Sequence, residues 1–157
     1  MSTDGHRERP AGAAQGAGTG SERTRPRVQT RLLDGTEQIW AGHEGPLRSV
    51  RVIDVTSVIA GPFATNLLAD FGAQVIKIEQ PGAGDACRAM GPFARGQSLR
   101  FPSLNRNKKC VTLNLADARG AALFRRLCAD ADLLVENYRP GVMERWGLGP
   151  DDLRREN

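Results

Sequence analysis

Residues 51–79, RVIDVTSVIAGPFATNLLADFGAQVIKIE, contain the pattern that decides the fold. The run 50–55 is rich in β-branched residues, as strands are, and Ala-Gly-Pro at 60–62 ends it. The apolar residues that follow recur at helical spacing: Phe63, Leu67, Leu68 and Phe71. Gly72 suits the end of a helix, and a second β-branched run occupies 74–79. This stretch therefore predicts a strand, a helix and a second strand.

The alternation of strands and helices continues to the end of the chain. After a long loop at 80–106, residues 110–115 predict a third strand and residues 133–135 a fourth. Between these two strands, Asp117 is a suitable N-cap for a helix. The apolar residues that this helix would bury are Ala121, Phe124, Leu127 and Cys128. Short helices are expected at 139–146 and 150–155.

This alternation predicts an α/β fold, with a Rossmann-like parallel sheet flanked by helices. In such sheets ligands usually bind at the carboxyl ends of the strands. The loops that would meet there are 56–62, 80–106 and 136–141.

Length and composition suit one modest globular domain, since 39% of the 157 residues are hydrophobic. Residues 1–46 are polar and rich in glycine and arginine, so they predict a disordered tail before a folded domain at 47–157. No stretch is apolar enough to span a bilayer or to serve as a secretory signal. Three cysteines without a repeated spacing favour neither a disulfide framework nor a metal site, and a cytoplasmic location is the simplest expectation.

The net charge of +4 comes from the predicted domain, because the six arginines of residues 1–46 are balanced by six acids. Several basic residues of the domain follow one another without an intervening acid: Arg95, Arg100, Arg106, Lys108 and Lys109. Such a run favours an anionic partner, although a plain solvated surface explains it equally well. A nucleic-acid partner is not expected, because the arginines of the tail are balanced.

The sequence lacks the motifs of the commonest nucleotide-binding and nucleophilic sites. No G-x-G-x-x-G opens a helix after a strand, and there is no G-x-x-x-x-G-K-[ST] phosphate loop. The two histidines, His6 and His43, lie in or beside the tail, away from any cysteine or serine that they could activate. NAD, ATP and a Ser-His or Cys-His site are therefore not expected.

Three motifs remain as candidates, each with a structural and a functional interpretation. AGPF at 60–63 is either a tight turn or a helix N-terminus open to an anion. LNRNKK at 104–109 is either a basic surface turn or a phosphate-binding edge. ENYRPG at 136–141 is closed by a turn, yet its four polar side chains exceed what a turn requires. Arg139 and Arg145 could both face one phosphate-rich ligand.

Taken together, these motifs resemble the N-terminal part of the family III CoA-transferases, the CaiB/BaiF group, which also includes α-methylacyl-CoA racemases. The resemblance covers about residues 47–157 without interruption. The segments that carry it are RVID (51–54), AGP (60–62), LADFGA (68–73), VIKIE (75–79), PG and GD (within 81–85), LNRNKK (104–109), LNL (113–115), VENYRPG (135–141) and GLG (147–149).

The resemblance implies a CoA-binding Rossmann-like domain that takes a CoA thioester, within an interlocked homodimer. It also implies which residues contact coenzyme A: Ile59, Ala60, Gln80, Leu113, Asn114, Leu115, Ala116, Asn137, Tyr138, Arg139 and Arg145. Gln80 and Ala116 stand where basic residues occur in some relatives.

In the transferases of this family, an aspartate attacks the acyl-CoA thioester. The resemblance puts that aspartate downstream of the segment that matches 151–157, and the acid/base pair of the racemases would also lie there. We therefore expect this chain to be truncated before the nucleophile and inactive alone, with no catalytic residue to nominate. The alternatives are a racemase-type fragment and a non-catalytic interaction or remnant protein. The LNRNKK approach looks closer to the transferases.

Overall fold

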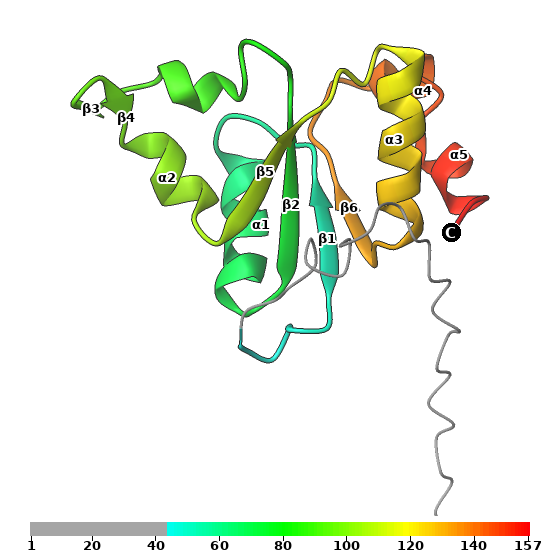
Figure 1. Cartoon of the computed structure of the whole chain (residues 1–157), viewed down its shortest axis with the longest axis horizontal. Coiled ribbons are helices and arrows are strands. Elements are labelled where there is room, and N and C mark those ends of the chain that lie inside the picture. The colour runs from blue at the N-terminus through cyan, green and yellow to red at the C-terminus, as the bar shows by residue number, and fades with distance from the viewer. Residues whose placement is uncertain (1–43) are drawn as a thin grey trace, which may run out of the picture.

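The computed structural model describes residues 44–157. Four parallel strands form the main sheet in the order β5-β2-β1-β6 (Figure 1). Their bounds are Arg51–Asp54 for β1, Gln74–Glu79 for β2, Lys108–Thr112 for β5 and Leu133–Val135 for β6. The predicted α/β fold with a Rossmann-like parallel sheet is confirmed. The disordered tail predicted for residues 1–46 lies, up to residue 43, outside the described residues.

Helices cover both faces of the sheet. The helix α1 (Ala60–Asp70) connects β1 to β2 and packs on one face, whereas α3 (Ala118–Ala129) connects β5 to β6 and packs on the other (Figure 1). Two short helices, α4 (Val142–Arg145) and α5 (Pro150–Arg154), follow β6 and add to the α3 side. Successive strands of this sheet are therefore joined by connections that contain a helix, as parallel strands require.

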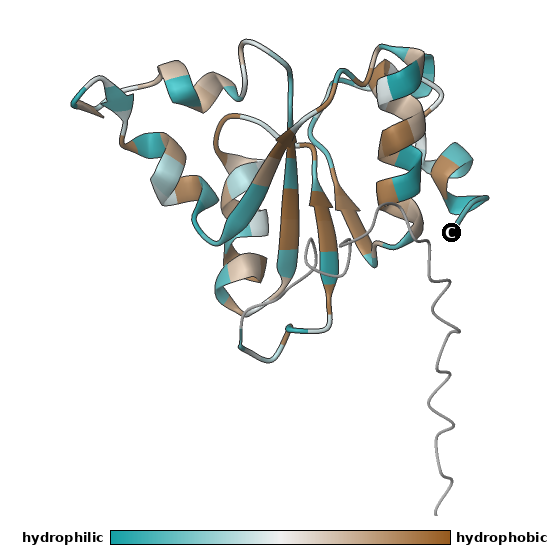
Figure 2. Ribbon diagram, viewed as in Figure 1, coloured by the Kyte–Doolittle hydropathy of each residue, from teal (hydrophilic) through white to brown (hydrophobic). Residues whose placement is uncertain are grey.

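The core follows from the alternation of side chains along the strands. Ile53 and Ile76 point to the α3 side, where they pack with Phe124, while Val52 and Val75 point to the α1 side. Hydrophobic residues accordingly concentrate on the central strands and on the facing side of α3 (Figure 2). Both faces of β1 and β2 are buried, although each strand also contains charged residues.

The amphipathic pattern predicted α1 correctly, but it did not show which side of the helix is buried. The buried residues of α1 are Pro62, Thr65, Asn66 and Ala69. The residues at helical spacing are instead largely exposed, with Phe63, Leu67 and Phe71 between 42% and 56% accessible. Together with Ile59, they form a continuous apolar stripe on the outside of the helix, which we call the α1 stripe.

The long loop predicted at 80–106 is wrong, because most of it is structured. It contains a 3₁₀ helix, η2 (Ala86–Ala89), a short antiparallel hairpin of β3 (Phe93–Ala94) and β4 (Gln97–Ser98), and the helix α2 (Arg100–Asn105). These elements extend beside β5 and α1 (Figure 1). The third strand was expected at 110–115, but β5 begins and ends earlier.

The predicted start of α3 is confirmed. The carboxylate of Asp117 accepts hydrogen bonds from the backbone N–H groups of Arg119 and Gly120, as an N-cap does. Of the residues expected to be buried here, Phe124 and Cys128 are, and Ala121 and Leu127 pack partly buried against the same core.

Two glycines permit close approaches on either side of the sheet. A Cβ atom on Gly120 would collide with the carbonyl oxygen of Asn114, so glycine lets α3 begin directly against the turn that follows β5. A Cβ atom on Gly61 would collide with the side chain of Thr56, which fixes how closely α1 can follow β1.

Candidate functional site

The residues that the resemblance implies as ligand contacts follow the carboxyl ends of the four parallel strands. Ile59 and Ala60 follow β1, and Gln80 follows β2. The stretch 113–116 follows β5, and 137–139 follows β6. Because the strands are parallel and in register, these four segments lie along one edge of the sheet, which we call the carboxyl edge. Arg145 lies at the end of α4, one short turn after β6.

The segment after β5 turns sharply into α3. Its Asn114 side chain accepts a hydrogen bond from the N–H of Ala116 at 3.2 Å, which shapes the turn. Leu115 is only 6% exposed and belongs to the core under α3, and Leu113 packs against the same core. At Leu115, therefore, a ligand at the carboxyl edge would meet mainly the backbone, whereas Asn114 and Ala116 are exposed.

The segment after β6 presents aromatic and cationic groups. The ring of Tyr138 meets that of Trp146 edge to face, with centroids 5.3 Å apart. Burial, followed by the nearby Glu136 carboxylate, raises the pKa of the Tyr138 phenol, so this group stays protonated at neutral pH. Tyr138 and Arg139 also line a groove of about 660 Å³ between β6 and the helices α4 and α5.

Arg139 and Arg145 are both exposed. Within residues 44–157, neither guanidinium takes part in an ion pair. The amino end of α1, which faces the same edge, has no side-chain cap among the described residues. Exposed cations beside an uncapped helix N-terminus form an arrangement that attracts phosphate groups.

Behind this edge lies a group of buried charges that the sequence interpretation missed. The Lys108 ammonium is fully buried and lies 2.9 Å from the Asp54 carboxylate. It also reaches the Pro62 carbonyl, the Thr65 hydroxyl and the Asn105 amide oxygen, at 2.7 to 2.9 Å. A buried ammonium requires such partners, because leaving it unpaired would be costly.

A second buried pair lies beside the first. The Lys77 ammonium is 2.7 Å from the Asp85 carboxylate and donates to the backbone carbonyl of Thr56 at 2.7 Å. Burial by itself would raise the pKa of Asp54, but Lys77 and Lys108, with two hydroxyl donors, lower it below its ordinary value. Burial lowers the pKa of Lys108, although Asp54 opposes the change. We call Asp54, Lys77, Asp85 and Lys108 the buried charge cluster.

The buried charge cluster continues toward η2 and α2. Arg88 donates two hydrogen bonds to the Glu79 carboxylate, each 2.7 Å long, and its guanidinium lies 3.6 Å from the centre of the Phe101 ring. The hydrogen bond from Arg88 is the main cause that lowers the pKa of Glu79 to about 2. Glu79 also accepts the N–H of Asp85 at 2.8 Å, so it connects Arg88 to the loop after β2.

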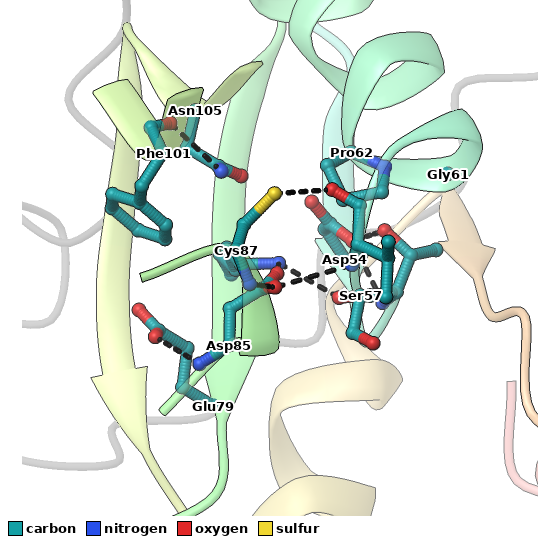
Figure 3. Close-up of polar contacts among 12 residues, drawn as sticks. Asp54, Ser57, Gly61, Pro62, Glu79, Asp85, Cys87, Phe101 and Asn105 are labelled. Carbon is teal, nitrogen blue, oxygen red and sulfur yellow. Dashed lines mark hydrogen bonds and ion pairs between the residues drawn. The ribbon is translucent and has the colours of Figure 1, made fainter. Parts of the chain in front are cut away.

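Several side chains, Asp85 and Cys87 among them, hydrogen-bond the backbone between β1 and α1 (Figure 3). Asp85 accepts the N–H of Val58 at 3.1 Å, and the Cys87 thiol donates to the carbonyl of Val58 at 2.7 Å. Asn137 bonds both the N–H and the carbonyl of Ser57 at 2.9 Å. Val58 has a φ of 73°, a left-handed conformation that is rare for a β-branched residue.

The LNRNKK stretch does not form an open phosphate-binding edge. It lies at the amino end of β5, opposite the carboxyl edge, and its Lys108 ammonium is buried. Arg106 and Asn107 both bond the Asp70 carboxylate at the end of α1. Of the two interpretations offered for this stretch, the structure supports the turn, which has a structural role.

The buried charges could have been found from the sequence by one signal. Asp54 and Lys77 are charged residues of β1 and β2, the two central strands, and each stands between two apolar residues. Both faces of a central parallel strand are covered, so a charged side chain there is buried whichever way it points and must be paired. The partners, Asp85 and Lys108, could not be assigned, because they lie far away in sequence.

Residues 44–157 contain no candidate for two other kinds of site. Among residues 44–157 there is no group of three or more side chains that could hold a metal ion. Within the same range, no helix has the length and apolar character that crossing a bilayer requires.

Comparison with known proteins identifies the family. The family model described as CoA-transferase family III matches residues 47–157. A relative from Chloroflexus aurantiacus, the succinyl-CoA--L-malate CoA-transferase beta subunit, is 52% identical over 113 residues, which are 71% of this chain and 28% of the relative. The mouse succinyl-CoA:glutarate CoA-transferase is 46% identical over 131 residues, covering 78% of this chain and 30% of the relative.

A solved structure agrees with these matches. A CaiB/BaiF family protein from Brucella suis superposes with a TM-score of 0.68 at 34% identity, over 73% of this chain and 32% of that protein. The chain thus spans about a third of the length of the relatives it matches. On its sequence and its fold, this chain belongs to the family III CoA-transferases.

Proposed function

We propose that residues 47–157 bind coenzyme A, as an acyl-CoA thioester, for an enzyme that transfers CoA from the thioester to a carboxylic acid. The observation that carries the proposal is that segments from all four parallel strands bring the expected CoA-contacting residues to one edge. With neighbouring strands about 4.8 Å apart, this edge is about 14 Å wide, which suits an extended ligand.

The chemistry of the carboxyl edge supports an anionic ligand with apolar parts. Arg139 and Arg145 are exposed cations that can pair with CoA phosphates. The uncapped amino end of α1 adds backbone donors. Leu113 and Tyr138 offer apolar surface beside them.

No described acid is proposed as the nucleophile. Asp54 and Asp85, which lie behind the edge, are at most 3% exposed, and each is paired with a lysine. We therefore propose that the 157-residue chain alone binds acyl-CoA without transferring it. An isotope-exchange assay between acyl-CoA and free acid tests this, and enzyme-dependent turnover would refute it.

The substrate class can be proposed from the relatives. The Chloroflexus and mouse relatives are named for succinyl-CoA as donor and for the dicarboxylic acids malate and glutarate as acceptors. These names favour a transferase over the racemase-type alternative. Succinyl-CoA is accordingly the first thioester to test.

The interlocked homodimer implied by the family remains a proposal. It is supported by the exposed α1 stripe, because contiguous apolar surface of this kind commonly marks an interface. Sedimentation equilibrium of the chain measures the association directly, and a monomer at every accessible concentration would count against it.

Binding of CoA to the full 157-residue chain tests the proposed function. Isothermal titration with CoA is expected to give saturable binding that weakens with salt. Arg139→Ala is expected to weaken binding about tenfold, the value of one charge-assisted contact. Arg126→Ala is the matched control, since it removes an exposed arginine near the far end of α3. A folded chain that binds no CoA would overturn the proposal and favour a non-catalytic interaction protein.

A further inference from the structure

Thr56, Ser57 and Val58, which lie between β1 and the N-cap residue of α1, Ile59, are held by side chains. Every backbone N–H and carbonyl group from Thr56 to Val58 has a side-chain partner within 3.1 Å. The residues that supply these six hydrogen bonds are Asp54, Lys77, Asp85, Cys87 and Asn137. Six side-chain hydrogen bonds on three consecutive residues fix the conformation of this segment.

The segment needs this support because its backbone is strained. Val58 is β-branched and has a φ of 73°, a left-handed conformation that is unfavourable for such residues. Without its partners, the segment would relax to ordinary backbone angles. Ile59 and Ala60, which follow directly and are proposed to contact CoA, would then move with it.

The partners approach from two sides that differ in exposure. Four of the five lie on the inner side and are nearly or fully buried, including Asp85 at 3% exposure. Asn137 alone comes from the outer side, at the surface and 80 residues away in sequence. Its side-chain oxygen accepts the N–H of Ser57 and its side-chain nitrogen donates to the Ser57 carbonyl, at 2.9 Å each.

We propose that Asn137 is a positioning residue for CoA binding: it acts through the Ser57 backbone and holds the strained Val58, so that Ile59 and Ala60 are in place before the ligand arrives. This rests on the proposed function and changes the role implied for Asn137, which is no longer a direct contact with CoA. Holding a binding segment in its bound conformation strengthens affinity, because the ligand no longer has to order it.

The first experiment needs no ligand. Hydrogen exchange of the Ser57 and Val58 amides, followed by NMR, is expected to become at least about tenfold faster in Asn137→Ala, because local opening becomes easier. Asn157→Ala is the matched control: this surface asparagine also bonds two backbone carbonyls, those of Cys128 and Ala131, but far from the carboxyl edge. Unchanged exchange at Ser57 and Val58 in Asn137→Ala overturns the proposal.

The second experiment measures CoA affinity in a double-mutant cycle. Asn137→Ala is expected to weaken CoA binding about tenfold, as the population of the competent conformation falls. Val58→Gly removes the strain, since glycine adopts a φ of 73° at little cost. In the Val58→Gly background, the loss from Asn137→Ala should therefore shrink to about threefold or less.

The two experiments separate the possible failures. If Asn137→Ala weakens CoA binding equally in both backgrounds, Asn137 contacts CoA directly and the positioning role is wrong. If the unmodified chain binds no CoA, the proposed function fails, whereas the hydrogen-exchange result still decides whether Asn137 holds Ser57. Thermal unfolding checks that every variant is folded, and Asn137→Ala is expected to unfold within a few degrees of the unmodified chain because this side chain is exposed.

Discussion

Toward the carboxyl ends of the central strands, the two faces of the sheet differ in what holds them together. On the α3 side, Ile53, Ile76 and Ile78 pack with Phe124 in an apolar core. On the α1 side, the next residues along the same strands are Asp54, Lys77 and Glu79, all buried and all paired. Alternation along two central strands thus places an apolar core and a set of charges one peptide apart.

The comparison of the two faces shows which one determines the shape of the carboxyl edge. Apolar contacts are non-directional and tolerate small changes, whereas hydrogen bonds and ion pairs require particular distances and angles. The charged face bonds directly to the backbone between β1 and α1, through Lys77, Asp85 and Cys87. The apolar face therefore contributes mainly to stability, and the charged face fixes geometry at the proposed CoA site.

The largest expected effect comes from breaking the charged face. Lys108→Met leaves Asp54 buried without its closest ion-pair partner, and the free energy of unfolding is expected to fall by about 3–5 kcal/mol. Urea denaturation measures the loss. The double variant Asp54→Leu/Lys108→Met should recover part of it, because no unpaired charge remains. A loss below about 1 kcal/mol in Lys108→Met would mean that the pair is not buried as described.

Acid should weaken the charged face next, and by less, because the Arg88 side chain of the Glu79 pair is 46% exposed. The folded-state pKa of Glu79 is lowered to about 2 from 4.5, so its contribution is fully present above pH 4.5 and is lost as the pH falls toward 2. Urea denaturation of Glu79→Gln and the unmodified chain between pH 7 and 2 measures this. The difference between them should be constant above pH 5 and shrink below pH 4, and a difference that grows with acid would contradict the sign.

A conservative change on the apolar face should have a smaller effect. Ile53→Val removes one methylene group from the core under α3, and we expect a loss of about 0.5–1.5 kcal/mol in unfolding free energy. CoA affinity should stay unchanged, since this side chain points away from the charged face. A weakened affinity at unchanged stability would show that the two faces are not separable.

The smallest expected effect is on the α1 stripe. Phe63 is 50% exposed, so Phe63→Ser should change the unfolding free energy of the monomeric chain by less than about 0.5 kcal/mol. Measurements at several protein concentrations separate the monomer from any assembly. A loss of several kcal/mol that grows with protein concentration would show that a second copy covers the stripe.

The sequence predicted those parts of the fold whose pattern is local. The strands β1, β2 and β6 and the helix α3 coincide closely with their expected ranges, because their apolar and capping residues are contiguous or periodic. The predicted range of β5 was displaced by a few residues, because β5 is an edge strand whose exposed side chains do not form a continuous apolar pattern. Its first residue, Lys108, is charged because it pairs with Asp54 of another strand. A local sequence pattern cannot show a pairing of this kind.

The site was predicted only in outline. Strand ends identify an edge of the sheet, and the family resemblance supplies candidate residues along it. The role of Asn137 could not be predicted, because its partner Ser57 lies 80 residues earlier in the chain. The apolar pattern did not show which face of α1 is buried for a related reason: Thr65 is buried because Asp54 and Lys108 need its hydroxyl group, and such a demand overrides the apolar pattern.

The two close-approach glycines have a consequence for substitution tolerance. Gly61 touches Thr56 beside the proposed CoA residues after β1, and Gly120 touches Asn114 beside those after β5. Saturation mutagenesis of the chain should therefore find both positions intolerant even of alanine, although neither contributes a functional group. Variation that retunes ligand preference along this edge would be confined to the exposed residues between these two fixed points, such as Gln80 and Ala116.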